Sequence, residues 1–370
     1  VHAFGISSIG NYFATFLAIG IAATIWLILD RLEFLKSESH LESVVSRESG
    51  FLFNNLVLLA SCFAVLWGTL FPVISEAVTG EKISVDAPFF NKVNIPIGLC
   101  LLFLTGVGPL VAWRRSSVES LKRNFLWPTV SMFVTIAALF GAGIRSEYAL
   151  LSFGLCMFVT VTISSEFVKG AIAIAGKDKM NPLLAIVELT HRNTRRYGGY
   201  LVHMGIVVMF IGFTGAAFNK DMIHEAALGQ SFNIGRYELK ITDLKDGEND
   251  NYAWMKAAID VYVGGEKIDT LSPERRIYKA SRQPASEVAI RRRLNEDLFL
   301  NFAAMATQGQ GAVIQAYVFP LVSWIWVGFF VVLFGTLVCL IPSKIKYSYA
   351  RTEIVGSVSA ASKGQVHAKT

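Results

Sequence analysis

Long apolar runs alternate with short polar segments along most of the chain, and this pattern predicts about seven transmembrane helices. A helix needs about 20 apolar residues to cross a hydrocarbon layer of about 30 Å. The fifth run is expected to be the weakest span, because Ser164, Ser165 and Glu166 crowd its end. The runs of suitable length are Ile9–Leu29, Phe51–Phe71, Ile95–Trp113, Phe125–Gly143, Tyr148–Val168, Tyr200–Phe218 and Leu321–Ile341.

The segment 219–315 has a different pattern. Tyr237–Asp243 and Met255–Val263 alternate apolar with polar residues, which is typical of half-buried β-strands. Gly264–Gly265 predicts a tight hairpin turn into a further strand, Glu266–Leu271. We therefore expect a small antiparallel β domain here, either a sandwich or an open barrel.

Basic residues gather in the loops on one side of the predicted bundle, and such loops remain in the cytoplasm. The opposite short loops carry only Lys82, Lys92 and Arg145. This asymmetry predicts that residue 1 and the β domain lie on the outer side of the membrane. The basic side carries Arg31, Lys36, Arg47, Arg114, Arg115, Lys122, Arg123, Lys169, Lys177, Lys179, Arg192, Arg195, Arg196, Lys344, Lys346 and Arg351.

The predicted fold is mostly α: a polytopic membrane helix bundle with a small antiparallel β domain inserted on its outer side. The expected divisions are membrane helices at 1–218, the periplasmic β-rich domain at 219–315 and the last transmembrane helix at 316–341. A basic cytoplasmic tail at 342–370 is expected to be disordered.

Composition supports an integral membrane protein, because 53% of the residues are hydrophobic and only 17% are charged. The net charge of +6 does not indicate nucleic-acid binding, since the basic residues lie mainly in short loops. Cys62, Cys100, Cys156 and Cys339 lie within apolar runs and form no CxxC pair, so we expect buried, small hydrophobic side chains. No secretory signal peptide is predicted after Val1, and we expect one part of a longer or split protein.

His203 is the main candidate for a functional residue, because it lies within the apolar run Tyr200–Phe218. A titratable side chain at membrane depth is costly and usually has a partner. Imidazole is an axial ligand of haem iron, so a b-type haem site is one hypothesis; a hydrogen bond near the interface is the other. Val207, Phe210 and Thr214 share its helix face, whereas Gly205 and Gly212 lie on the opposite side, where small residues allow close helix packing.

The other polar candidates are weaker when judged from the residues alone. His2 precedes the first span and is expected at the outer surface, while His40, His191, His224 and His367 are expected to be solvated. Arginines make the outer domain locally basic and would suit haem propionates or lipid headgroups, although a solvated surface explains most of them. No Walker A, GxSxG or HExxH sequence is present, which argues against ATPase, common hydrolase and zinc-protease chemistry.

Taken together, several short motifs make the chain similar to one family. It resembles the C-terminal part of the CcmF family of haem lyase subunits in cytochrome c maturation, within the wider CcmF/CcsA-type haem-handling family. The resemblance covers nearly all of the chain up to about Ile341. The matching stretches are Val1–Phe4, Arg47–Asn55, Gly68–Pro72, Gly80–Val85, Pro88–Asn91, Arg195–His203, Pro273–Arg276 and Trp324–Trp326.

The resemblance implies a role for two histidines. His203 matches the transmembrane ligand of a b-type haem, and His2 matches one of two external histidines that hold the haem to be attached. The implied reaction joins haem vinyl groups to the cysteine thiols of a CxxCH motif through thioether bonds. The implied partners are haem, the haem chaperone CcmE, a CcmH-type subunit, apocytochrome c and quinol as a candidate electron donor.

One feature of the family is missing from this chain. The tryptophan-rich external segment is not present, and Trp324–Trp326 is not that motif. The partner histidines also belong to the family's N-terminal part, so this chain would supply half of each bis-histidine site. Two other classes remain open from the residues: a multi-pass transporter or permease with His203 on its path, and a non-catalytic assembly scaffold that acts through the β domain.

Overall fold

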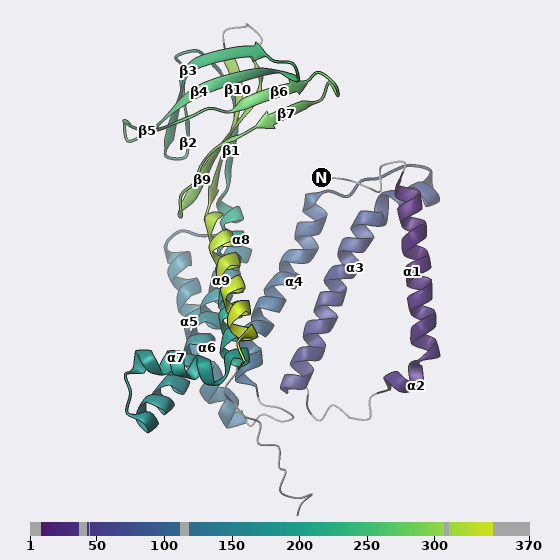
Figure 1. Ribbon diagram of the computed structural model, residues 1–370, viewed down its shortest axis with the longest axis vertical. Coiled ribbons are helices and arrows are strands. Elements are labelled where there is room, and N and C mark those ends of the chain that lie inside the picture. The colour runs from purple at the N-terminus through teal and green to yellow at the C-terminus, as the bar shows by residue number, and fades with distance from the viewer. Residues whose placement is uncertain (1–8, 37–42, 44, 112–117, 307–310, 343–370) are drawn as a thin grey trace, which may run out of the picture.

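The computed structural model describes residues 9–36, 43, 45–111, 118–306 and 311–342. Seven of its helical segments are long and apolar enough to cross a membrane, as the sequence predicted. Figure 1 shows these helices below a separate β domain. The membrane helices are α1 (Gly10–Asp30), α3 (Arg47–Thr79), α4 (Ala87–Val107), α5 (Val118–Gly141), α6 (Glu147–Asp178), α8 (Thr194–Thr214) and α9 (Ser323–Leu340).

Shorter helical elements join these spans. They are α2 (Leu32–Leu35), η2 (Gly108–Leu110), α7 (Pro182–Arg192) and η3 (Gly215–Phe218). Helix α7 was not predicted, and it runs across the direction of the membrane helices at the end opposite the β domain (Figure 1). Asn181 caps its start by accepting a hydrogen bond from the Leu183 amide, and Pro182 occupies the first turn, where a missing amide hydrogen costs nothing.

Helix α6 is the central helix of the bundle, which corrects the expectation that it would be the weakest span. It packs against α4, α5 and α8. Val159 and Thr162 are fully buried, and the helix continues through Glu166 to Asp178. The polar residues did not end it because Ser165 donates its hydroxyl hydrogen to the Thr162 carbonyl and Glu166 has cationic partners.

Helices α4, α3 and α1 follow one another on one side of the group formed by α5, α6, α8 and α9 (Figure 1). Gly10 is the one buried residue of α1. Cys62 on α3 and Cys100 on α4 are exposed, so the prediction of burial was wrong for these two, whereas Cys156 is buried. The reason is physical: an apolar run marks a helix that avoids water, but it does not say whether protein or lipid covers a given face.

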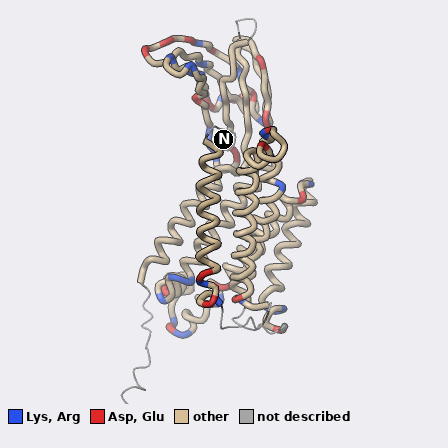
Figure 2. Tube along the Cα trace, turned by 90° about the vertical axis from the view of Figure 1, so that its right-hand side faces the viewer, with Lys and Arg blue, Asp and Glu red and all other residues tan. Residues whose placement is uncertain are grey.

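Charged residues gather at the two ends of the helices and in the β domain, whereas the middle of the bundle is almost free of them (Figure 2). This distribution is what a bilayer requires, since ionised side chains are costly in the hydrocarbon layer. The chain is therefore a multi-pass membrane protein.

The β domain consists of two antiparallel sheets. One has the order β1-β10-β9-β8, and the other has the order β2-β3-β4-β6-β7 with β5 paired to β4. The strands are β1 (Lys220–Ala227), β2 (Ser231–Ile234), β3 (Tyr237–Glu248), β4 (Tyr252–Val263), β5 (Glu266–Leu271), β6 (Glu274–Tyr278), β7 (Pro284–Glu287), β8 (Ala289–Arg291), β9 (Glu296–Met305) and β10 (Gly311–Pro320).

Alternation along these strands builds the core of the domain, as predicted. Leu239, Ile241 and Ile259 are fully buried, and Leu300 and Ile314 meet them from the other sheet. Gly264 and Gly265 both have positive φ, 61° and 83°, which the tight β4–β5 turn requires. Strand β10 runs on to Pro320, past the expected boundary at residue 315, because its side chains keep alternating between core and surface up to the start of α9.

The β domain is joined closely to the bundle through α8 and α9. A Cβ atom at Gly215, in η3, would collide with the carbonyl oxygen of Pro320. Ser323, at the start of α9, donates a hydrogen bond to buried Asp297 of β9 at 3.2 Å. Leu321, which lies between the end of β10 and the start of α9, has a φ of 60°. This backbone conformation is costly for a bulky residue and needs support from its surroundings.

Candidate functional site

Helix α8 has one face built for very close packing. Cβ atoms at Gly198, Gly205 and Gly212 would meet the backbone nitrogens of Cys339, Val332 and Ile325 at 2.9, 2.6 and 2.8 Å. Glycine at each position therefore lets α8 and α9 approach backbone to backbone, as predicted for Gly205 and Gly212. This seam fixes the rotation of α8 about its own axis.

The opposite face of α8 points toward α4 and α6. Tyr200, His203, Val207, Phe210 and Thr214 follow one another at steps of three and four residues, so they share this face. Thr214 is hydrogen-bonded to Ser152 of α6 at 2.6 Å, and the Cys156 thiol of α6 donates to the Val207 carbonyl at 3.7 Å. Phe210 lies against Gly98 of α4.

His203 is half-buried on this face, and its Nδ1 atom is buried without a hydrogen-bond partner. A buried polar atom without a partner loses its hydration and gains nothing in exchange, so such atoms are rare unless a missing group completes them. An imidazole in this state keeps nitrogen available for a metal or a hydrogen bond. The residue therefore fits an axial ligand of haem iron.

The described residues contain no group of three or more His, Cys, Asp or Glu side chains that could hold a metal ion. His2, the other predicted ligand, lies outside the described residues, as do His40 and His367.

The two remaining histidines are partly exposed, but they do not lie in the polar loops that the sequence suggested. His191 is half-buried on α7, and the ring of His224 on β1 lies 4.8 Å from that of Phe232. Both belong to regular elements that pack against neighbours, whereas the sequence suggested polar loops. His203 is the one histidine within a membrane helix in the part of the chain that the structure describes.

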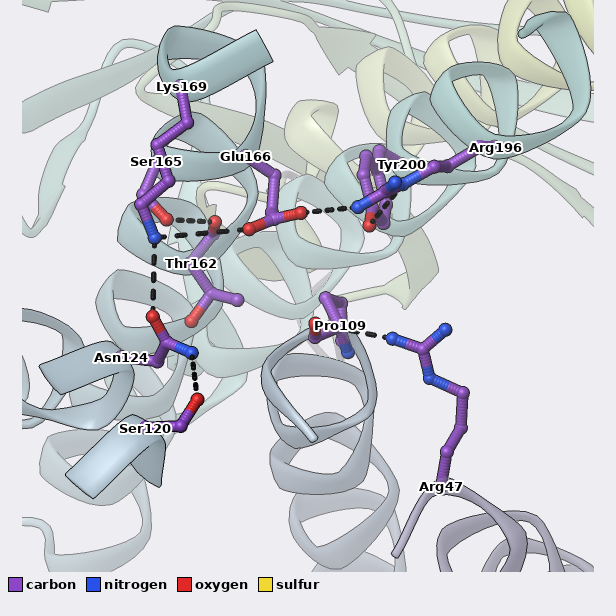
Figure 3. Close-up of polar contacts among 10 residues, drawn as sticks. All are labelled: Arg47, Pro109, Ser120, Asn124, Thr162, Ser165, Glu166, Lys169, Arg196 and Tyr200. Atoms are coloured by element: carbon purple, nitrogen blue, oxygen red, sulfur yellow. Dashed lines mark hydrogen bonds and ion pairs between the residues drawn. The ribbon is translucent and has the colours of Figure 1, made fainter. Parts of the chain in front are cut away.

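A polar cluster is centred on Arg196, which lies about two helical turns before His203 on α8. Figure 3 shows the residues of this cluster. Arg196 forms an ion pair with Glu166 of α6 at 2.6 Å and donates from Nε to the hydroxyl of buried Tyr200 at 3.1 Å. Lys169 lies 4.0 Å from Glu166 and donates to Asn124 of α5 at 3.5 Å. The cluster joins α5, α6 and α8 at their ends opposite the β domain.

Sequence reasoning missed this cluster, although one signal was available. Arg196 precedes His203 by two turns and so belongs to the same face, but it was interpreted as a topology-determining charge and as part of a family motif, not as the partner of a carboxylate. Arg47, also in Figure 3, joins the start of α3 to η2, which follows α4, by donating to the Gly108 and Pro109 carbonyls at 3.2 and 3.4 Å.

Comparison with known proteins identifies the β domain first. Residues 217–320 match the family described as the CcmF C-terminal beta-sandwich. This span agrees with the two-sheet domain from β1 to β10.

Relatives extend the similarity over almost the whole chain. The cytochrome c-type biogenesis protein CycK of Rhizobium meliloti is 29% identical over 94% of this chain and 51% of its own length. CcmF of Haemophilus influenzae is 28% identical over 94% of this chain and 53% of its own length. The chain thus spans about half the length of the curated relatives it matches.

A solved structure shows the same fold. The chain titled "Cytochrome c Heme Lyase CcmF" superposes with a TM-score of 0.65 at 24% identity, covering 81% of this chain and 46% of that one. The predicted fold class, a membrane helix bundle with an antiparallel β domain, is therefore confirmed. From the sequence motifs, the match of the β-sandwich and the CcmF and CycK relatives, we conclude that this chain belongs to the CcmF family of cytochrome c-type biogenesis proteins and corresponds to its C-terminal part.

Proposed function

We propose that this chain is the C-terminal part of a membrane haem lyase for cytochrome c, in which His203 is an axial ligand of a b-type haem. The observation that carries the proposal is the buried, unpaired Nδ1 of His203 on a helix face that looks into the bundle. A relative and a structural neighbour named CcmF, one titled a haem lyase, support the same activity.

The haem to be attached is the substrate of the proposed reaction. Each thioether bond forms when a cysteine thiol of a CxxCH motif adds across a haem vinyl group, so the sulfur binds one vinyl carbon and the thiol hydrogen ends on the other. His2 would hold this haem outside the membrane. The chaperone CcmE would deliver the haem, and a CcmH-type subunit would present the apocytochrome c.

A b-type haem bound at His203 would supply electrons, with quinol as the candidate donor, to keep the iron of the substrate haem ferrous. Other residues of this chain would hold His203 in the orientation that this role requires. The glycine seam with α9 fixes the rotation of α8, so His203 faces α4 and α6. Burial excludes water from Nδ1 of His203. The ion pair of Arg196 with Glu166 joins the start of α8 to α6.

The bacterial relatives support a location in the bacterial inner membrane, and the positive-inside rule supports an orientation with the β domain in the periplasm. The helix ends that carry Arg31, Arg47 and Lys122 lie at the end of the bundle opposite the β domain (Figure 1).

The proposal is tested by cytochrome c assembly in cells that depend on this protein, produced with the N-terminal part found in its relatives. His2→Ala and His203→Ala should each lower the yield of holocytochrome c by at least about ten-fold, whereas the matched control His191→Ala should not. His2→Ala should also keep the b-type absorption. Wild-type yields from both variants would overturn the lyase assignment and favour a scaffold or a permease.

A further inference from the structure

Helix α7 exposes an apolar face that no described element covers. Leu183, Leu184 and Val187 are 74%, 63% and 66% exposed, and they share one side of the helix. Ala185 and Leu189, on the other side, are 0% and 8% exposed. A short helix with both faces apolar needs a second apolar environment besides the protein core.

The packing of α7 gives its depth. Leu189 lies over Gly170 of α6, where an added Cβ would be 2.7 Å from the leucine side chain. Gly170 is about 35 Å along α6 from Glu147, at 1.5 Å per residue. Because the hydrocarbon layer is about 30 Å thick, α7 lies near the boundary between acyl chains and headgroups.

The charges around α7 favour an anionic partner. Arg192 uses its guanidinium on Asp178 at 2.6 Å and on Glu188 at 2.9 Å, so these carboxylates are already neutralised. Lys177, Lys179 and Arg195 are exposed nearby, and no ion pair joins them to a carboxylate among the described residues. Three cations remain beside an apolar face.

We propose that α7 is an interfacial helix that buries Leu183, Leu184 and Val187 in the bilayer boundary and binds anionic phospholipid headgroups through Lys177, Lys179 and Arg195. A helix at this depth that exposes an apolar face and has basic residues near both ends matches the chemistry of an anionic lipid surface. The helix then anchors the inner end of α8, which follows it directly along the chain.

The test replaces Leu184 with the photo-cross-linker p-benzoylphenylalanine in the assembled protein, in nanodiscs of phosphatidylcholine with phosphatidylglycerol as the minority lipid. Irradiation should give lipid adducts at position 184, detected by mass spectrometry. The matched control places the same cross-linker at Leu228, which is 56% exposed in the β domain and should give none.

The second arm tests the headgroup. Phosphatidylglycerol should be enriched at least about two-fold among the adducts over its share of the lipid, and Lys177→Gln, Lys179→Gln and Arg195→Gln together should remove the enrichment. An adduct to a protein segment would show that a polypeptide covers α7, and no adduct would show a solvated face. Lipid adducts without enrichment would remove the headgroup part of the proposal. Each of these three results overturns the proposal as stated.

Discussion

Arg196 is the nearest charge to His203 along their helix, since the residues from Tyr197 to Phe218 contain no Asp, Glu, Lys or Arg. Seven residues separate them, which is about 10 Å along the helix axis. Glu166, with a side chain only 16% exposed, balances the arginine charge. In a low-dielectric surrounding, a charge at this distance still changes the redox potential of an electron-accepting group.

Glu166→Gln should therefore raise the midpoint potential of a haem bound at His203, because an unbalanced positive charge favours the reduced state. A redox titration followed by absorption measures this shift. Glu188→Gln is the matched control, since Glu188 also pairs with an arginine but lies on α7, off the His203 face. An unchanged potential, or an equal shift in both variants, would contradict the electrostatic link.

At the scale of elements, the seam between α8 and α9 depends on glycine at particular positions. Gly205→Ala should destabilise the protein by about 1–3 kcal/mol, because its Cβ would lie 2.6 Å from the backbone nitrogen of Val332. Gly199→Ala, on the same helix, meets nothing within 4 Å and should be neutral or stabilising. Thermal unfolding in detergent separates the two; equal loss of stability would show that the seam does not need the glycine.

The β4–β5 hairpin should respond to acid through Asp260. Lys267 at 2.7 Å and the Thr270 hydroxyl hold the pKa of this carboxyl below its ordinary value of 3.8. A lowered pKa contributes stability that is fully present above the ordinary value and is lost as the pH falls through the lowered one. The protection factors of the β4 and β5 amides, which correct for the pH dependence of intrinsic exchange, should therefore fall below about pH 4, and less so in Asp260→Asn. The same pH profile in wild type and Asp260→Asn would show that this carboxyl is not the cause of the acid sensitivity.

Much of the element pattern could be predicted from sequence because hydropathy acts locally. Seven apolar runs predicted seven membrane helices, alternation predicted β3 and β4, and the Gly264–Gly265 turn predicted β5. Helix α7 was not predicted because its apolar residues lie on two sides of the helix, so they do not form a single apolar stripe in the sequence. The cluster of Glu166 with Arg196 escaped because it joins residues from two helices, and their proximity is set by packing rather than by spacing.

At the scale of the whole molecule, the glycine seam and the contact at Gly215 join the β domain to the bundle through α8 and α9. The side of the membrane on which the β domain is accessible therefore reports the orientation of the bundle. A membrane-impermeant thiol reagent should label Leu228→Cys in the β domain from the periplasm, and Lys177→Cys only after the membrane is opened. Wild type supplies the blank, since its four cysteines lie in membrane helices. The reverse labelling pattern would invert the orientation.

The central claim is that His203 binds a haem within the membrane. The most direct measurement is the reduced-minus-oxidised absorption spectrum of the purified protein, produced with the N-terminal part that its relatives carry. Wild type, His203→Ala and the control His224→Ala should be compared. We predict a b-type spectrum in wild type that His203→Ala loses and His224→Ala keeps; a haem-free wild type, or a spectrum that survives in His203→Ala, would contradict the claim.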